Sequence, residues 1–169
     1  METRLAKNSD LPNLKIMYKK IVENMNNNNI NIWDEYYPYE LFSEDIEKNS
    51  LYLLVNNNEI MAAFALNELY SNEQNLKWSI PEEKAVYINR VGVNVDYLKC
   101  GIGSALIKEA VEIVKKNNSK YLRLLVVDNN EPAIGLYIKN KFKQVEGIYE
   151  EEIDDDLTLI EYGFELKII

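Results

Sequence analysis

The stretch from residue 91 to residue 106, V-G-V-N-V-D-Y-L-K-C-G-I-G-S-A-L, constrains the fold of this chain more than any other. It opens with valines that alternate with small or polar residues, which is the pattern of a β-strand. After a turn that contains two glycines, apolar residues recur at helical spacing from Ile102 onward. The sequence therefore predicts a strand that runs through a glycine loop directly into the N-terminus of a helix.

Such a loop is chemically suited to a phosphate group. The first N–H groups of a helix have no acceptor within the helix, and they lie at the positive end of its dipole. Gly101 and Gly103 carry no Cβ atom that would keep a ligand away from the backbone. A single G-x-G is a weak motif, however, and a plain strand-to-helix turn is the competing interpretation.

Composition limits the classes of function. The chain has 169 residues, which fit a single domain spanning 1–169, and its net charge of −9 argues against a nucleic-acid-binding face. The single cysteine, Cys100, excludes an internal disulfide and favours a cytoplasmic location. Histidine is absent, so we expect neither a histidine-based triad nor a histidine-ligated metal, and no metal site is predicted. We see no apolar signal core and no run of membrane-spanning length, so no membrane partner is expected.

The first half of the chain predicts a short strand, two helices and a hairpin. Helical spacing of apolar residues begins near Leu14, and a second helix follows Phe42. Between these helices, residues 33–42 are dense in aromatic rings and carboxylates. Core packing is the default interpretation, and the wall of a substrate pocket is the alternative. Residues 51–55 and 60–69 then read as an antiparallel hairpin, and residues 71–81 as a polar loop.

The second half alternates strands and helices. In the strand over residues 85–95 the alternation changes phase, which a β-bulge near Asn89 and Arg90 would absorb; a strand buried on both faces is the alternative. A helix over 101–116, an apolar strand over 121–127 and a short helix opened by Pro132 follow. We expect a strand over 142–149, a solvated acidic loop over 150–156 and a final strand over 160–168. The predicted class is α/β, a mixed sheet in the order β-α-α-β-β-β-α-β-α-β-β.

Two separated motifs resemble those of the GNAT superfamily of acetyl-CoA-dependent N-acetyltransferases. The first is V-x-V followed by a pyrophosphate loop, Gln/Arg-x-x-Gly-x-Gly/Ala, which here reads L-K-C-G-I-G from Leu98 to Gly103. The second is Asn-x-x-Ala-x-x-Leu-Tyr-x-x-x-Gly-Phe, which here begins at Asn130, reaches Tyr137 and ends at Phe142. Leu98 replaces the usual Gln or Arg, and Lys141 replaces the usual Gly. The resemblance implies the GNAT-like fold and acetyl-CoA as cofactor.

The resemblance also implies roles for particular residues. Backbone groups of Val91 and Val93 would hold the pantetheine arm and the acetyl carbonyl, with the Val93 N–H as the oxyanion donor. Asn130 would contact the pantetheine, and Tyr137 would be the general acid that protonates the thiolate. The pyrophosphate would be bound by the loop residues Leu98, Lys99, Cys100, Gly101, Ile102, Gly103 and Ser104.

Several alternatives stay open. No carboxylate lies on the strand before V-x-V, so the general base is unassigned; Glu82, Glu83, and a water held by Tyr87 or Asn89 are weak candidates. Cys100 has no histidine to activate it, which favours direct transfer in a ternary complex over an acetyl-enzyme.

The acceptor is a primary amine, of a small molecule or a peptide. The alternative function is a catalytically silent acyl-CoA sensor. A dinucleotide-binding domain does not fit, because no third glycine follows in register. The final strand, if exposed, is a candidate for pairing in a homodimer.

Overall fold

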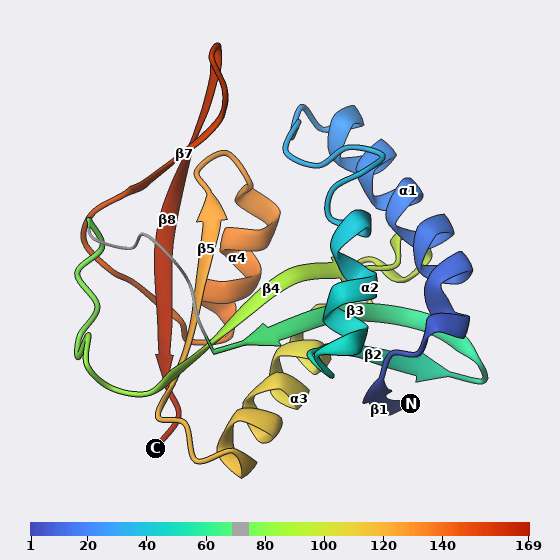
Figure 1. Ribbon diagram of the computed structural model, residues 1–169, viewed down its shortest axis with the longest axis horizontal. Coiled ribbons are helices and arrows are strands. Elements are labelled where there is room, and N and C mark those ends of the chain that lie inside the picture. Colours follow the sequence, from blue (N-terminus) through green and yellow to red (C-terminus); the bar gives the residue numbers. More distant parts are fainter. Residues whose placement is uncertain (69–74) are drawn as a thin grey trace. The chain divides into compact units, whose positions relative to one another are not determined.

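A computed structural model of the chain describes residues 1–68 and 75–169 and shows a mixed α/β fold (Figure 1). By internal contacts the chain divides into two compact units. Unit 1 comprises Met1–Leu66 and Asn89–Glu109, and unit 2 comprises Asn67–Ile88 and Ala110–Ile169. The elements are β1 (Glu2–Leu5), α1 (Leu11–Asn27), α2 (Phe42–Glu47), β2 (Leu51–Asn56), β3 (Glu59–Asn67), β4 (Ala85–Val93), the 3-10 turn η3 (Val95–Tyr97), α3 (Ile102–Lys116), β5 (Tyr121–Val127), α4 (Glu131–Lys139), β6 (Lys143–Gln144), β7 (Tyr149–Asp154) and β8 (Leu157–Lys167), with two further 3-10 turns, η1 (Asn8–Asp10) and η2 (Tyr39–Leu41).

Unit 1 is built on strands in the order β1-β2-β3-β4, of which β1–β2 and β2–β3 are antiparallel. The predicted helices and hairpin are all present, because one face of each helix and one face of each strand is apolar. The buried core of this unit combines α1, α2 and one face of β2 and β3. It contains Leu14, Met17, Tyr18, Ile21, Phe42, Leu51, Leu53, Val55, Ile60, Ala63 and Ala65.

The aromatic segment before α2 is divided between core and surface. Trp33 and Tyr39 pack against the core of unit 1, and Phe42 is fully buried, as the core-packing interpretation predicts. Tyr36 and Tyr37, in contrast, are exposed, and their backbone N–H groups are held by the side chain of Asp34. The core-packing interpretation therefore holds for Trp33, Tyr39 and Phe42, and the pocket-wall interpretation of the exposed tyrosines stays a prediction.

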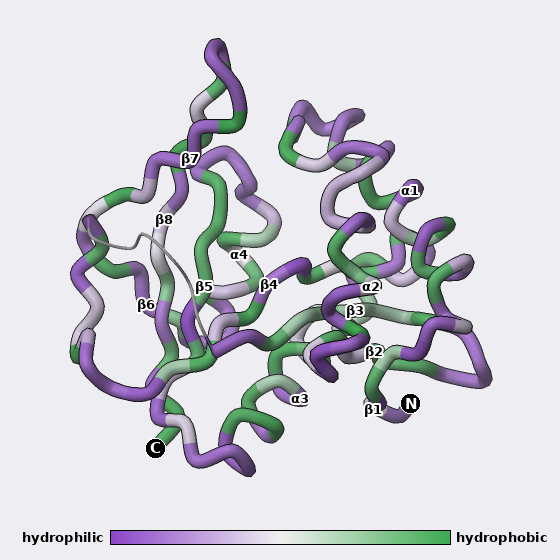
Figure 2. The backbone as a smooth tube through the Cα atoms, in the orientation of Figure 1, coloured by the Kyte–Doolittle hydropathy of each residue, from purple (hydrophilic) through white to green (hydrophobic). Residues whose placement is uncertain are grey.

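Unit 2 is centred on β5. The first residues of β4 pair with it in parallel, from Ala85 opposite Tyr121 to Tyr87 opposite Arg123, and β8 pairs with it antiparallel along its whole length. β5 is strongly hydrophobic, as predicted for a central strand (Figure 2). β8 pairs on its other side with β6 and with β7.

A buried ion pair anchors the loop before β4 to this sheet. The guanidinium of Arg123 donates to the carbonyl of Ile80 at 2.8 Å, and its Nε lies 3.5 Å from a carboxylate oxygen of Glu165. Glu165 also accepts hydrogen bonds from the backbone and the hydroxyl of Ser79. Trp78 stacks over the guanidinium at 4.8 Å. Arg123, a charged residue on the central strand β5, thus holds the loop that precedes β4.

The C-terminal region differs from the sequence prediction. The strand predicted over 142–149 is reduced to the two residues of β6, and the acidic stretch predicted as a loop is mostly β7, which forms a hairpin with β8. Strand pairing outweighed the low β-propensity of Glu and Asp here. The final strand is therefore paired on both sides and is not the exposed edge that was expected, while the homodimer itself stays a prediction.

Residues 69–74 lie outside the described residues, so Leu69 of the predicted strand and residues 71–74 of the predicted polar loop have no counterpart to compare. Across the described ranges, no helix combines the length and the apolar character needed to cross a membrane.

Candidate functional site

The distal half of β4, in unit 1, has an irregular backbone at the position where a bulge is predicted. Arg90 adopts a left-handed conformation with φ of 54°, which is uncommon for a residue with a side chain. It separates the regular first half of β4 from the segment Val91–Val93. The change of alternation in the sequence therefore coincides with a real break in the strand.

Tyr18 of α1 stabilises this break. Its hydroxyl donates to the carbonyl of Arg90 at 2.5 Å, and its side chain is buried. The hydroxyl also occupies the space beside Gly92, where a Cβ atom would lie only 2.6 Å from the Tyr18 oxygen. Gly92 is thus required by close packing of α1 against β4.

Asp45 of α2 holds the side chain of Arg90. Its Oδ2 lies 2.9 Å from Nε of Arg90, and both side chains are largely buried. The contact is an ion pair whose angles are not those of a hydrogen bond. Burial raises the pKa of the Asp45 carboxyl, and the nearby Arg90 charge only partly offsets this effect. Two helices therefore fix the backbone and the side chain of Arg90.

The backbone after the break has N–H groups outside the β5 ladder. Asn94 donates its N–H to the carbonyl of Met61 on β3 at 2.9 Å. Because successive N–H groups of an extended strand point to opposite sides, the N–H of Val93 points away from β3. Among the described residues, the only part of β4 that pairs with β5 is Ala85–Tyr87. The N–H of Val93 is therefore not part of that ladder. The predicted oxyanion donor is therefore oriented away from the sheet of its own unit.

Asn94 fixes the turn that follows. Its side chain donates to the carbonyl of Ile60 at 3.1 Å and accepts from the N–H of Asp96 at 3.1 Å, and the residue is buried. These bonds connect β3 to η3, which leads into the glycine loop. Sequence reasoning gave Asn94 no role, although an asparagine directly after a strand is a recognisable turn signal.

The loop from Leu98 to Ser104 forms the predicted entrance to α3. Lys99 and Gly101 both have positive φ, 61° and 81°, and a Cβ at Gly101 would meet nothing within 4 Å. The carbonyl of Gly101 accepts the first α-helical hydrogen bond, from Ala105 at 3.0 Å. The amides of Ile102 and Gly103, in the first turn, therefore have no acceptor in the helix. Leu98, Lys99 and Cys100 are exposed.

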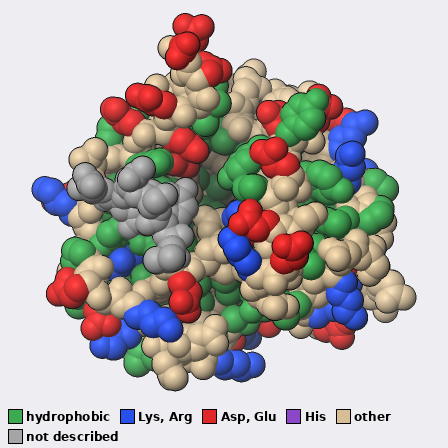
Figure 3. Space-filling view, viewed as in Figure 1, with side chains coloured by type: hydrophobic (Ala, Val, Ile, Leu, Met, Phe, Trp, Pro, Cys, Tyr) green, Lys and Arg blue, Asp and Glu red, His purple; other side chains and the backbone are tan. Residues whose placement is uncertain are grey.

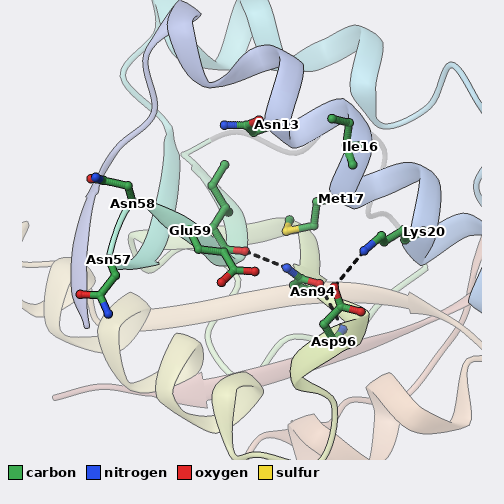
Figure 4. Close-up of a pocket in the computed structure, with 10 residues that line it drawn as sticks. Asn13, Ile16, Met17, Lys20, Asn57, Asn58, Glu59, Asn94 and Asp96 are labelled. Atoms are coloured by element: carbon green, nitrogen blue, oxygen red, sulfur yellow. Dashed lines mark hydrogen bonds and ion pairs between the residues drawn. The ribbon is translucent and has the colours of Figure 1, made fainter.

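A separate surface cavity of about 300 Å³ lies in unit 1 between α1, the β2–β3 turn and η3 (Figure 4). Lys20 and Asp96 point toward one another on one side of it, with their charged atoms 2.8 Å apart. The other lining residues are Asn13, Ile16, Met17, Asn57, Asn58, Glu59, Ile60 and Asn94. None of the predicted site residues lines this cavity, so it is distinct from the glycine loop.

The remaining predicted residues lie in unit 2, around α4. Asn130 is the N-cap of this helix, with its side-chain oxygen 3.4 Å from the N–H of Ala133. Tyr137 is buried against Phe142 and Phe164, with ring centroids 5.7 and 6.4 Å away. Burial raises the pKa of the Tyr137 hydroxyl, which keeps it protonated at neutral pH.

The structure thus groups the predicted residues in two sets. Val91, Val93 and the loop to Ser104 lie together in unit 1, whereas Asn130 and Tyr137 lie together in unit 2. Sequence reasoning missed the side chains that fix β4, namely Tyr18, Asp45 and Asn94. It also missed a buried carboxylate on β8, that of Glu161.

Comparisons with known proteins identify the family of the chain. The model of the acetyltransferase (GNAT) family matches residues 18–142. An N-alpha-acetyltransferase from Sulfurisphaera tokodaii is 28% identical over 113 residues, which are 66% of this chain and 68% of that protein.

Solved structures show the same fold. One from Staphylococcus aureus Mu50, described as an acetyltransferase, has a TM-score of 0.75 at 23% identity, with both chains covered completely. Another, an acetyltransferase from Salmonella typhimurium with its cofactor acetyl-CoA, has a TM-score of 0.68 at 12% identity, covering 99% of this chain and 94% of that one.

These matches confirm the predictions of an α/β fold with a mixed sheet, of an acyltransferase and of acetyl-CoA as the cofactor of the family. The family model covers well over half of the chain, including both motifs that carried the resemblance. This chain belongs to the acetyltransferase (GNAT) family.

Proposed function

We propose that the protein is an N-acetyltransferase that transfers the acetyl group of acetyl-CoA to a primary amine by direct attack in a ternary complex, in the cytoplasm. The main support is the backbone of unit 1, where the N–H of Val93 lies outside the β5 ladder and the N-terminus of α3 follows at Ile102. Among acceptors we favour the α-amino group of a peptide, because the similar protein from Sulfurisphaera tokodaii is an N-alpha-acetyltransferase.

The glycine loop fits the anionic part of the cofactor. Residues 97–105 contain no carboxylate, Lys99 adds a positive charge, and the space beside Gly101 is open. The amides between Lys99 and Ser104 would hold the pyrophosphate, since helix N-termini bind such groups. Backbone groups of Val91 and Val93 would hold the pantetheine arm, and Asn130 would add a contact. When bound, acetyl-CoA supplies an acetyl group activated as a thioester.

Two groups of the chain would stabilise the oxyanion and donate a proton to the leaving sulfur, namely the N–H of Val93 and the hydroxyl of Tyr137. The N–H of Val93 is the donor that we assign to the developing oxyanion, and a donor of this kind contributes roughly 10²–10³ in rate. The hydroxyl of Tyr137 holds the proton that we assign to the leaving sulfur. Burial favours the protonated hydroxyl, which is the form that a general acid requires.

Cys100 is the competing nucleophile, and its surroundings support direct transfer instead. The residue is exposed, its Sγ lies 3.5 Å from the carbonyl of Leu98, and no histidine exists in the chain to activate it. An acetyl-enzyme found after mixing with acetyl-CoA alone would contradict direct transfer.

Titration calorimetry with acetyl-CoA and with CoA tests the cofactor site, on the wild type and on Gly103→Glu. We expect binding by the wild type and its loss in the variant, whose carboxylate would repel the phosphates. Gly135→Ala is the matched control, because a Cβ there meets nothing within 4 Å. If the wild type does not bind either ligand, the cofactor site as proposed is wrong.

An acceptor assay then tests the reaction. Eight-residue peptides that begin with Met, Ser or Ala are compared with an N-terminally blocked peptide carrying one lysine, and with spermidine. We expect acetylation of at least one free N-terminus and none of the blocked peptide. Tight acetyl-CoA binding without turnover on any of these amines would favour the acyl-CoA sensor instead.

A further inference from the structure

We propose that Glu161 on β8 is the general base that removes a proton from the ammonium group of the acceptor. This role rests on the proposed N-acetyltransferase function, and it fills the position that the sequence left unassigned. All of the residues that carry the argument belong to unit 2.

Glu161 is a buried carboxylate with unused hydrogen-bonding capacity. The residue is 8% exposed, and among the described residues its Oε2 has no hydrogen-bond partner. Burying a carboxylate without partners is unfavourable, and groups of this kind occur mainly where function requires them. In the part of the chain that the structure describes, the two other buried carboxylates, Asp45 and Glu165, each face an arginine. Glu161 does not, so a structural ion pair does not explain its burial.

Glu161 lies at the end of β5, where the family motif begins. It pairs with Val127, the last residue of β5, three residues before Asn130. On the other side it pairs with Tyr149 of β7. Residues 161 and 164 of β8 point to opposite faces of the sheet, and Phe164 packs against Tyr137. The side chain of Glu161 and the ring of Tyr137 are therefore on opposite faces of the sheet.

The charges around Glu161 favour the binding of a cation such as the acceptor ammonium group. From β7, Tyr149 lies opposite it and Glu151 lies diagonally opposite on the same face. From β5 and β8, the charged groups of that face are Arg123 and Glu165, which are paired with each other, and the exposed Lys167, opposite Tyr121 at the other end of β5. From β6, Lys143 lies opposite Glu165. Acidic side chains also gather at the tip of the β7–β8 hairpin, at the top of the view (Figure 3). An ammonium group approaching the strands beside Val127 would meet negative charge, whereas Lys143 and Lys167 lie toward the other end of β5.

The proposed step is a single proton transfer. One N–H bond of the acceptor ammonium breaks, an O–H bond forms at the Glu161 carboxylate, and the electron pair stays on nitrogen as the nucleophilic lone pair. The proton then passes to water. Burial and the Glu151 charge raise the pKa of Glu161 to about 7. This value is close to the pKa of about 7.7–8.0 of an α-amino group and well below that of about 10.4 of lysine, so the match favours peptide N-termini.

The test compares pH profiles of kcat/KM for the wild type, Glu161→Gln and Glu150→Gln, using whichever of the three free peptides turns over fastest. Glu150 is exposed on the same hairpin, so its substitution gives the same change in charge. For Glu161→Gln we expect a loss of 10²–10⁴-fold at pH 7 that narrows toward pH 9, where the amine is neutral without help. Calorimetric affinity for acetyl-CoA should be the same in all three proteins.

The outcomes separate the two proposals. If the wild type turns over and Glu161→Gln has the same rate and pH profile, the role of Glu161 is wrong and the proposed function stands. If the wild type acetylates spermidine and none of the peptides, the match of Glu161 to peptide N-termini is wrong; if it acetylates none of the amines, both proposals fail. If Glu161→Gln loses acetyl-CoA binding in parallel with its rate, the residue acts on the fold of the site and not as a base.

Discussion

Asp45 and Arg90 form a buried ion pair, with Oδ2 and Nε 2.9 Å apart, between the short helix α2 and the left-handed residue of β4. The pair connects a helix that no family motif includes to the strand that precedes the glycine loop. Together with the Tyr18 hydroxyl on the Arg90 carbonyl, it determines where the backbone of β4 leaves regular geometry.

Replacing Asp45 by Ala should therefore destabilise unit 1. The guanidinium of Arg90 would remain buried without its counter-charge, a situation that costs about 3–5 kcal/mol. Urea unfolding gives the free energy of unfolding. Glu44→Gln is the control, because the Glu44–Lys48 pair is exposed and its loss should leave the free energy of unfolding nearly unchanged. A loss for Asp45→Ala as small as that of the control would contradict the role of the pair.

Gly92→Ala should weaken both stability and acetyl-CoA binding. The new Cβ would lie 2.6 Å from the Tyr18 oxygen and 3.0 Å from Ile21 Cδ1, so α1 or β4 has to move. Overpacking of this kind costs about 1–3 kcal/mol. Thermal unfolding and calorimetry measure the two effects.

The same substitution at Gly135 is the matched comparison. This residue is exposed on α4 with open space around its Cβ, so Gly135→Ala should stabilise the helix by about 0.5–1 kcal/mol. Equal effects at the two glycines would show that the contact with Tyr18 is not what restricts position 92.

Tyr137→Phe should lower kcat by about 10²-fold or more while the fold is retained, since the ring still packs against Phe142 and Phe164. Steady-state kinetics on the best peptide acceptor gives kcat. Tyr97→Phe is the control, because it removes an exposed hydroxyl that donates to Glu59. Unchanged turnover in Tyr137→Phe would eliminate this hydroxyl as the general acid.

The titration of Glu161 should appear in stability as well as in rate. Its pKa of about 7 in the folded protein exceeds the ordinary value of 4.5, so between these values the folded state binds more protons than the unfolded state. Stability should therefore fall as pH rises through this window, by on the order of 3 kcal/mol at about 1.4 kcal/mol per pH unit.

Urea unfolding at pH 5 and pH 8 measures this effect. Glu161→Gln cannot titrate, so it should be more stable than the wild type at pH 8 and lose the difference near pH 5. Parallel pH dependence in the two proteins would mean that Glu161 keeps an ordinary pKa.

Local patterns in the sequence were enough to predict most of the regular elements. The apolar run at residues 121–127 is β5 with the same limits, and the loop from Leu98 to Gly103 leads into α3 as expected. The change of alternation near Arg90 also identified the break in β4. These features depend on neighbouring residues, for which periodicity and glycine positions are direct signals.

The features that were missed depend on residues distant in sequence. Tyr18 and Arg90 are 72 residues apart, and no spacing rule links them. Glu161 reads as a polar position on an alternating strand, and only the pairing of β8 with both β5 and β7 buries it. The β7–β8 hairpin did leave a signal that was not used, because Asp155 and Asp156 form a two-residue turn between two runs capable of pairing.

The acidic composition of β7 has a consequence for self-association. Among the described residues this strand pairs with β8 alone, so it lies at an edge of the sheet, and four of its six residues are Glu or Asp. An unpaired edge is a template for strands of other molecules, and carboxylates along it oppose such docking by mutual repulsion and hydration. The most acidic stretch of the chain therefore protects the sheet against edge-to-edge aggregation.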